Sequence, residues 1–257
     1  MRIAVITGAS SGLGQEYVKE LGRKEEGIDE IWAIARRRER LESLSSMSSI
    51  PVRALSYDLI EKSSIHELEN LMADEKPDIR ILINAAGFGK IGSSADIGVE
   101  DTDRMIELNC RAAVDMTYIC LPYMTDGARI MEICSTSAFQ PFQYLNVYAA
   151  SKAFLYRFTR ALRVELFARR IKVTAVCPYW IRDTEFIPAA ENTGGKKEIR
   201  HYPLSSRVRS VAAHSLLDSK LGLAVSTPGI VCTIHRIAAK IIPSELMMGI
   251  WALLRRA

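Results

Sequence analysis

The sequence of 257 residues lacks the features that mark membrane-spanning, secreted and metal-binding proteins. It contains no run of about 18 apolar residues, so we expect no membrane-spanning helix. The apolar run in the opening MRIAVITG is too short for a signal peptide and predicts a first strand instead. The five cysteines form no Cys-x-x-Cys pair and lie mostly within apolar runs. This pattern predicts reduced, buried thiols in a cytoplasmic protein and no metal site.

Polybasic tracts, internal repeats and linker-like segments are also missing. The net charge is +4 with both signs spread along the chain, and the first half has no polybasic tract, which argues against a nucleic-acid partner. Because no low-complexity segment divides the chain, we expect residues 1–257 to form a single domain that is large enough to bury a substantial core.

Apolar runs of strand length alternate with longer stretches that have helical periodicity. The expected strands are residues 2–7, 30–35, 52–57, 79–84, 128–134 and 171–177. The expected helices are Gly14–Glu25, Ser63–Ala73, Thr102–Met124 and Tyr148–Arg169. Continuous apolar strands are typical of parallel sheets that are buried on both faces. The sequence therefore predicts an α/β fold, a doubly wound (Rossmann) parallel sheet of about seven strands with helices on both faces.

The segment TGASSGLG, Thr7 to Gly14, follows the first strand and begins a helix. Glycine lets the backbone turn tightly and approach a ligand closely, and the free N–H groups of a helix N-terminus bind phosphate. We therefore expect a dinucleotide pyrophosphate here, with a simple turn between strand and helix as the alternative. The loop residues expected to contact the cofactor are Gly8, Ser10, Ser11, Gly12, Leu13 and Gly14.

The end of the second strand indicates which dinucleotide binds. Proteins that bind NAD usually place an acidic residue there for the ribose hydroxyls, and no acid occurs from Ile31 through Arg38. Arg36 and Arg37 stand there instead, opposite the serines of the glycine-rich loop. Guanidinium and hydroxyl groups suit a 2′-phosphate, so we predict NADP(H), with Arg36 as the preferred phosphate ligand. Arg38 and Arg40 are expected to be solvated at the start of the next helix.

The sequence NVYAASKAF contains a tyrosine and a lysine four residues apart, Tyr148 and Lys152. On a helix these two side chains lie one turn apart on the same face. A nearby cation lowers the pKa of a phenol, and lowering it by about three units requires about 4 kcal/mol. The pair is therefore either an acid–base centre or two residues on a helix surface.

Several motifs in order resemble the short-chain dehydrogenase/reductase family, in its compact single-domain branch, from residue 2 to residue 186. TGASSGLG resembles the family's TGxxxGxG loop, NAAG resembles its NNAG, and YAASK supplies its Tyr-x-x-x-Lys. Asp58 and Leu59 follow the third strand, where the family contacts adenine, and Asn109 and Ser135 match two further family positions. NAAG adds four expected cofactor contacts, Asn84, Ala85, Ala86 and Gly87, with Ala85 in place of the family's second Asn. The long C-terminal tail resembles that of a ketoreductase subgroup.

The resemblance implies an oxidoreductase in which each of these residues has a role. Tyr148 would exchange a proton with the substrate oxygen, and Lys152 would lower the phenol pKa and hold the nicotinamide ribose. Ser135 would hydrogen-bond the substrate oxygen. Asn109 would hold a water that connects Lys152 to solvent. Because the family is commonly dimeric or tetrameric, we expect a homodimer or homotetramer with the Tyr148 helix at an interface.

The segment CPYWIRDTEF departs from the family after the sixth strand. The family has Pro-Gly and then a short run to a Thr, whereas here Tyr179 replaces the glycine and Thr184 is displaced by one residue. The family touches the nicotinamide carboxamide with this segment. Pro178, Ile181 and Thr184 are therefore assigned to the cofactor, with Asp183 as the alternative to Thr184, and Tyr179 is expected to fill space beside the reacting ring.

Aromatic residues gather around these motifs and predict an apolar substrate pocket. The residues expected to bind substrate are Phe88, Ser137, Phe142, Tyr144, Tyr179, Trp180 and Phe186. We expect an apolar, bulky or cyclic ketone or secondary alcohol, such as a steroid, and a substrate lid at residues 183–209. The alternatives are an NADP(H)-binding sensor without turnover and a family relative that catalyses isomerisation or dehydration.

The C-terminal segment, residues 228–257, has the pattern of two short amphipathic helices broken at Pro243. His235, Arg236 and Lys240 stand among Ile, Leu, Met and Trp residues. Such helices lie on anionic membranes or, more often, pack on the domain or on a second subunit. We favour packing or dimerisation, keep peripheral membrane contact as the alternative, and expect His235 at the surface.

Overall fold

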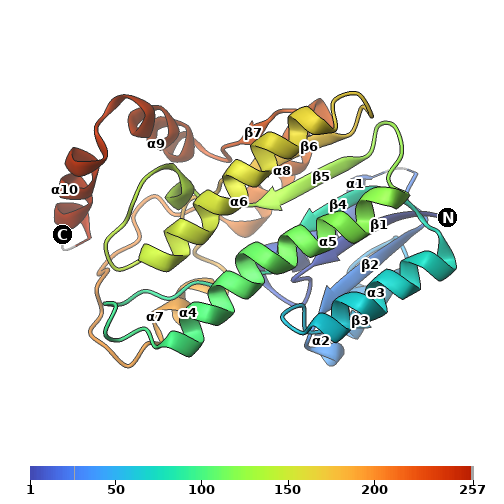
Figure 1. Cartoon of the computed structure of the whole chain (residues 1–257), viewed down its shortest axis with the longest axis horizontal. Helices are drawn as coiled ribbons and strands as arrows, with labels where there is room; N and C mark the ends of the chain where they lie inside the picture. The colour runs from blue at the N-terminus through green and yellow to red at the C-terminus, as the bar shows by residue number, and fades with distance from the viewer. Residues whose placement is uncertain (26, 256–257) are drawn as a thin grey trace.

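The computed structural model describes residues 1–25 and 27–255, and its centre is one sheet of seven parallel strands (Figure 1). In chain order the strands are β1 Arg2–Thr7, β2 Glu30–Ala35, β3 Val52–Ser56, β4 Asp78–Asn84, β5 Arg129–Ile133, β6 Lys172–Val176 and β7 Val225–Ser226. Their order across the sheet is β3-β2-β1-β4-β5-β6-β7. The predicted doubly wound α/β fold is confirmed.

The central strands are apolar along their whole length because both faces of the sheet are covered. In β1, Ile3 and Val5 enter the core on one face, whereas Ala4 and Ile6 enter the core on the other. All four side chains are fully buried. This explains why a continuous apolar run, and not an alternating one, marks each of these strands.

Two layers of helices enclose the sheet (Figure 1). One face is covered by α1 Gly12–Lys24, α2 Arg38–Glu42 and α8 Val208–Leu221. The opposite face is covered by α3 Lys62–Glu75, α5 Ala112–Cys120 and α6 Asn146–Glu165. The core therefore consists of two apolar layers separated by the sheet.

The helix expected at Thr102–Met124 is interrupted. Its first part is α4 Val99–Ile106, and a π-helical turn, Glu107–Arg111, joins α4 to α5. A single π-helical turn inserts one extra residue into a helix and is frequent at functional sites. Here the turn contains Asn109, which is fully buried.

The chain builds the sheet outward from β1 in both directions, to β3 on one side and to β7 on the other. Doubly wound folds bind ligands outside the carboxyl ends of the strands where the order reverses, which here is between β1 and β4. A short helix, α7 Phe186–Glu191, lies in the predicted lid, and a parallel bridge between Ile181 and Ser206 joins the two ends of this segment.

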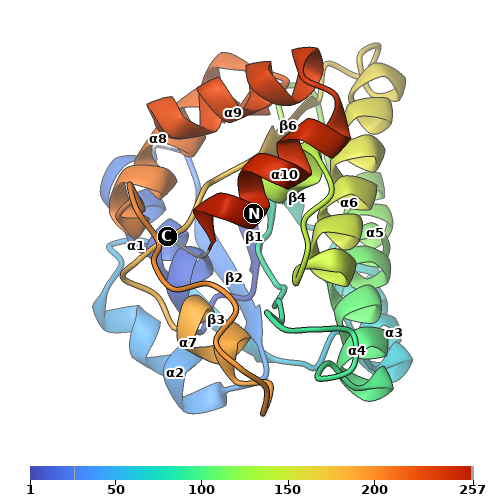
Figure 2. The same cartoon turned by 90° about the vertical axis from the view of Figure 1, so that its left-hand side faces the viewer.

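The last two helices, α9 Ile230–Ile241 and α10 Ser244–Leu254, lie on either side of Pro243 at one end of the molecule (Figures 1 and 2). Within residues 1–25 and 27–255, no helix is both long enough and apolar enough to cross a membrane.

Candidate active site

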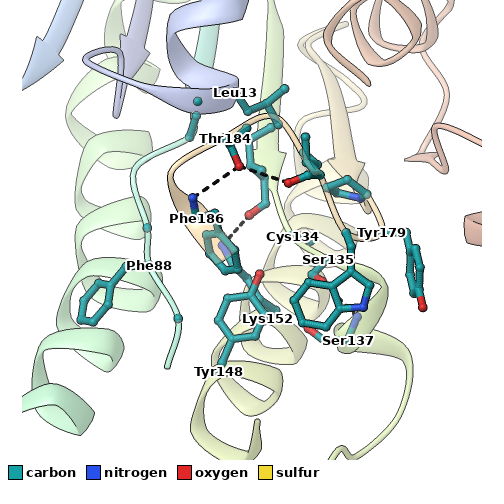
Figure 3. Close-up of a pocket in the computed structure, with 18 of the residues that line it drawn as sticks. Leu13, Phe88, Cys134, Ser135, Ser137, Tyr148, Lys152, Tyr179, Thr184 and Phe186 are labelled. Carbon is teal, nitrogen blue, oxygen red and sulfur yellow. Dashed lines mark hydrogen bonds between the residues drawn. The ribbon is translucent and has the colours of Figure 1, made fainter. Parts of the chain in front are cut away.

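A cavity of about 990 Å³ opens at the carboxyl ends of the central strands. Its walls come from segments far apart in the chain: the glycine-rich loop, the turns after β2, β4, β5 and β6, helix α6 and the two C-terminal helices (Figures 2 and 3). Nearly all of the predicted site residues line it, and three of them do not: Asn84, Asn109 and Tyr144.

The glycine-rich loop packs tightly against the turn after β4. Gly8 has a φ angle of +67°, and a Cβ atom there would lie 2.7 Å from the backbone nitrogen of Ala86. A Cβ atom at Gly14 would overlap the carbonyl oxygen of Gly8. Side chains at these positions would push the loop away from its neighbours, so glycine is required for this packing. The result is a backbone cradle with the N-terminus of α1 at the cavity wall, which suits a pyrophosphate.

The two arginines after β2 take different positions. Arg37 Nε donates a hydrogen bond to Ser10 Oγ at 3.2 Å, so its guanidinium lies beside the glycine-rich loop. Arg36 Nη1 lies 3.6 Å from a carboxylate oxygen of Asp58. Sequence reasoning preferred Arg36 as the phosphate ligand, whereas the structure brings Arg37, and not Arg36, to the loop serine.

Sequence reasoning missed Glu185. Its carboxylate lies 3.0 Å from Arg37 Nη1 and 2.6 Å from Arg40 Nη1. Hydrogen bonds from Arg40 and then from Arg37 lower the pKa of Glu185. Arg40, which was expected to be simply solvated, is therefore an ion-pair partner. A phosphate bound at Arg37 would compete with this carboxylate.

Helix α6 places Tyr148 and Lys152 in the wall of the cavity, and both side chains are buried (Figure 3). Lys152 Nζ lies 5.8 Å from the centroid of the Tyr148 ring and donates to the carbonyl oxygen of Ile133 at 2.7 Å. Ser135, two residues after the end of β5, lines the same cavity, and its Oγ accepts a hydrogen bond from Ser137 N at 3.1 Å. The tyrosine–lysine pair is thus not a feature of an exposed helix surface.

Burial controls the protonation of this group. It raises the pKa of the Tyr148 phenol, an effect that hydrogen bonding to Ser135 opposes, and it lowers the pKa of Lys152. Both shifts disfavour the charged forms, as expected for side chains removed from water. The Tyr148 phenol is therefore protonated in this state, and phenolate formation requires further positive charge nearby.

Asn109 lies behind the cavity wall and joins two parts of the site. Its Nδ2 donates to Phe88 O at 2.8 Å and to Ser151 Oγ at 3.0 Å, and its Oδ1 accepts from Phe88 N at 3.0 Å. Ser151 Oγ in turn donates to the carbonyl oxygen of Tyr148 at 2.8 Å. The side chain therefore positions the turn after β4 against α6. A water held by Asn109 stays a prediction.

Most of the residues expected to bind substrate line the cavity, namely Phe88, Ser137, Phe142, Tyr179, Trp180 and Phe186. The rings of Tyr148 and Phe186 have centroids 5.5 Å apart, so apolar surface reaches the proposed acid. Ser137 Oγ is buried and has no hydrogen-bond partner within the described part of the chain. The cavity is thus mainly apolar with an unused hydroxyl in its wall.

Two tyrosines differ from expectation. Tyr144 lies beneath Arg255, whose guanidinium carbon is 4.1 Å from the ring centroid, and this contact keeps the ring out of the cavity lining. Tyr179 lines the cavity, but its ring points away from Tyr148 and Ser135 (Figure 3). It therefore does not fill the space beside these groups.

The displaced Thr184 keeps a place beside the glycine-rich loop. A Cβ atom at Gly12 would lie 3.7 Å from the Thr184 side chain, and Thr184 Oγ1 donates to Ile181 O at 3.2 Å (Figure 3). Asp183 instead accepts a hydrogen bond from Val208 N at 2.8 Å, at the start of α8. Thr184 therefore lines the cavity and Asp183 does not, while the contact of either residue with the nicotinamide stays a prediction.

Asn84, expected to contact the cofactor, is buried behind the sheet edge. Its Nδ2 donates to Glu132 Oε1 at 2.9 Å, to Thr117 Oγ1 at 3.0 Å and to Ala113 O at 3.2 Å. These bonds tie β4 to β5 and α5. The pleat of β4 thus turns the Asn84 side chain into the helix layer and away from the cavity, and a cofactor contact at this residue stays a prediction.

The C-terminal helices contribute a wall that sequence reasoning missed. Val231, Ile234 and His235 from α9 line the cavity, as do Met247, Ile250, Trp251 and Leu254 from α10. His235, expected at the surface, is half-buried, with Nε2 3.0 Å from Gln140 Oε1, and burial lowers its pKa. Nothing in the sequence connects this tail to residues near 140; only the fold brings them together.

Comparisons with known proteins agree with this geometry. The family model described as short chain dehydrogenase matches residues 2–193. An uncharacterized oxidoreductase of Staphylococcus epidermidis is 30% identical over 211 residues, which cover 80% of this chain and 89% of that protein. An NADP-dependent 3-hydroxy acid dehydrogenase of Salmonella typhi is 32% identical over 187 residues, covering 72% of this chain and 74% of that protein. The structure of a short-chain dehydrogenase from Sphingobium yanoikuyae in complex with NADPH has a TM-score of 0.79 at 26% identity, covering 96% of this chain and 95% of that chain.

Proposed function

Because the chain belongs to the short-chain dehydrogenase family, whose members are oxidoreductases of CH–OH and C=O groups, we propose that it interconverts an apolar ketone and its secondary alcohol with NADP(H). The observation that carries this proposal is the convergence of Tyr148, Lys152 and Ser135 in one mainly apolar cavity beside the glycine-rich loop.

The protein residues handle the proton. In the reducing direction, Tyr148 donates its proton to the carbonyl oxygen, since burial keeps the phenol protonated beforehand. Lys152, one turn away, stabilises the phenolate that remains. Ser135 hydrogen-bonds the same oxygen and stabilises its developing negative charge. The cofactor supplies the hydride when it is bound.

The residues around the glycine-rich loop fit NADP(H). The crowding at Gly8 and Gly14 leaves a backbone cradle for the pyrophosphate, and Arg37 with Ser10 offers a guanidinium and a hydroxyl for the 2′-phosphate. Asp58 lines the same cavity where adenine is expected. The NADP-dependent relative and the NADPH complex support the same choice.

The cavity wall supports an apolar, bulky or cyclic substrate. Aromatic rings and the aliphatic side chains of α9 and α10 form most of the surface near Tyr148. Ser137 Oγ, buried without a partner among the described residues, supplies one polar contact for a second oxygen on the substrate. Residues 183–209, which include α7, would close over the substrate as a lid.

We further propose a cytoplasmic homodimer or homotetramer. The cysteines of the described chain are free and buried, which suits a reducing compartment. Tyr118 on α5 and Phe154 on α6 are exposed, so the helix that carries Tyr148 presents apolar surface for a second subunit.

The experiment is NADPH consumption against a panel of cyclic and steroid ketones, with 3-oxo acids included because of the 3-hydroxy acid dehydrogenase relative. NADH and Tyr148→Phe are assayed in parallel. We expect turnover with NADPH that falls by at least about 100-fold in Tyr148→Phe, while NADPH binding is retained.

Three outcomes would contradict parts of this proposal. Similar Michaelis constants for NADPH and NADH would overturn the cofactor choice. Turnover of small charged acids or sugars alone would overturn the apolar substrate. Tight NADPH binding without turnover of any ketone would indicate the sensor that the sequence left open as an alternative.

A further inference from the structure

The C-terminal helices expose the apolar face that amphipathic helices normally bury. On α9, Ile230, Ile234, Ile237 and Ile241 follow the spacing of one helix face, and each is at least 54% exposed. On α10, Leu246, Ile250, Leu253 and Leu254 do the same, and each is at least 47% exposed. We call these eight exposed apolar side chains the tail face.

Only the inner side of α9 and α10 packs on the rest of the domain. Cys232 and Trp251 are buried, and Trp251 Nε1 donates to the carbonyl oxygen of Gln143 at 3.2 Å. Gln143 Nε2 returns a hydrogen bond to Met248 O at 3.2 Å. The expectation that the tail packs on the domain is therefore met on this side alone, and the tail face needs a different partner.

Residues of the tail face also line the cavity. Ile234, Ile250 and Leu254 line the cavity and are also largely exposed. Leu204, in the loop after α7, lines the cavity too and is 77% exposed. Some apolar side chains of the cavity lining are thus also exposed at the surface of the molecule.

The two segments that contribute Leu204 and the tail face to the cavity carry an excess of cations. Residues 196–204 contain three cations and one acid, and residues 230–255 contain three cations and one acid, a net charge of +4 together. The whole chain has 34 cations and 30 acids, so the remaining residues hold 28 of each and are neutral. Two of these six cations are neutralised, because Lys197 pairs with Glu191 at 3.2 Å and Arg255 with Glu198 at 2.9 Å. The other four, Lys196, Arg200, Arg236 and Lys240, form no ion pair among the described residues.

We propose that the tail face docks the protein on an anionic lipid bilayer. Apolar side chains rimmed by Lys and Arg are the chemistry that binds such a surface, with the apolar groups entering the headgroup boundary and the cations contacting lipid phosphates. A second copy of this chain fits less well. A twofold contact would place two positively charged segments together and would cover the opening of the cavity.

Docking would place the cavity opening against the acyl region of the bilayer. An apolar substrate could then enter from the lipid without crossing water. This consequence rests on the proposed function, whereas the docking does not, because binding to lipid is measured without turnover.

The test is co-sedimentation of the full-length protein with phosphatidylcholine vesicles that contain about 30% phosphatidylglycerol, which gives them a negative surface charge. The variant is Ile241→Ser combined with Leu253→Ser, since both side chains are 75% exposed and neither lines the cavity. The matched control is Val99→Ser combined with Leu221→Ser, which removes similarly exposed apolar groups from α4 and α8. Lys240→Gln tests the charge separately.

We expect the wild type and the control to bind the vesicles and the tail variant to lose at least about 10-fold in affinity. Lys240→Gln should weaken binding by roughly five-fold at low salt and by less at high salt. Failure of the wild type to bind, or equal binding by the tail variant and the control, would overturn the proposal. A dimer that the tail variant alone breaks, seen by sedimentation velocity without vesicle binding, would assign the face to a second copy.

Discussion

Glu132 is a carboxyl buried at the centre of the fold, and its ionisation should make stability depend on pH. The side chain points from β5 into the layer beneath α5, where its Oε1 accepts from Asn84 Nδ2 at 2.9 Å and from Thr117 Oγ1 at 2.8 Å. Its Oε2 has no partner within the described residues. Burial raises the pKa of Glu132 from 4.5 to about 7, although the two hydrogen bonds and the charge of Lys152 oppose this.

The sign follows from proton binding. Between pH 4.5 and pH 7 the folded protein holds a proton on Glu132 that the unfolded chain has released. Stability therefore falls as the pH rises through this window, and the loss is complete above pH 7. A rise of about 2.5 pKa units at 1.36 kcal/mol per unit corresponds to a loss of about 3 kcal/mol.

Glu132→Gln removes this loss. The amide retains an acceptor for Asn84 and Thr117 and adds a donor where Glu132 Oε2 and Asn84 Oδ1 lack partners among the described residues. Relative to the wild type, the variant should gain about 1 kcal/mol at pH 5 and about 3 kcal/mol at pH 8. At pH 8 the Tm should rise by about 6–12 °C for a domain of this size.

The assay is thermal or urea unfolding of both proteins from pH 5 to pH 8. The control is Glu67→Gln, which makes the same chemical change at an exposed carboxyl on α3. A difference between Glu132→Gln and the wild type that stays constant with pH would refute the reasoning, because it would show that Glu132 titrates alike in the folded and unfolded states.

Three further substitutions test the rest of the site. Gly8→Ala should weaken NADPH binding by at least about 10-fold in titrations, because the added Cβ atom sits on a residue at φ +67° and meets the turn after β4. The control Gly98→Ala should leave NADPH binding unchanged, since a Cβ atom there meets nothing within 4 Å. Asn109→Ala should lower the free energy of unfolding in urea by about 1–3 kcal/mol, because Phe88 N and Ser151 Oγ lose their hydrogen-bond partner. It should also lower kcat more than it changes KM. An unchanged kcat would show that Asn109 does not position Tyr148. Glu185→Gln should tighten NADPH roughly two- to five-fold and leave NADH unchanged, because the exposed carboxylate no longer competes for its two arginines; equal effects on both cofactors would contradict a 2′-phosphate subsite there.

Local sequence patterns were sufficient to predict the phosphate loop and to place Tyr148 and Lys152 together. Gly8 and Gly14 could be assigned to the loop without the tertiary structure, since a strand, a glycine-rich turn and a helix start follow one another directly in the sequence. Tyr148 and Lys152 lie on one helix, so their spacing alone places them together. The family, the oxidoreductase class and the doubly wound sheet followed from these motifs taken in order.

The direction of individual side chains could not be predicted in the same way. NAAG predicted four cofactor contacts, but Asn84 is the last residue of β4 and its side chain enters the opposite layer. Arg36 and Arg37 are adjacent, and which of them meets Ser10 depends on the pleat and twist at the end of β2. Because successive side chains point to opposite faces of a strand, a shift of one residue in either place would move the side chain to the other face of the sheet.

Contacts between distant segments were decided only by the tertiary structure. Glu185 meets Arg37 and Arg40 across about 150 positions of sequence, as the ion pairs show. The tail reaches the cavity through Ile234 and Trp251, although its own pattern indicated only an amphipathic helix pair. By itself, the sequence determined the order of strands and helices and the chemistry of the central motifs, because these depend on periodicity and spacing within single elements. The tertiary structure alone decided which remote side chains complete the cavity and which apolar face stays exposed, because these depend on how whole elements pack.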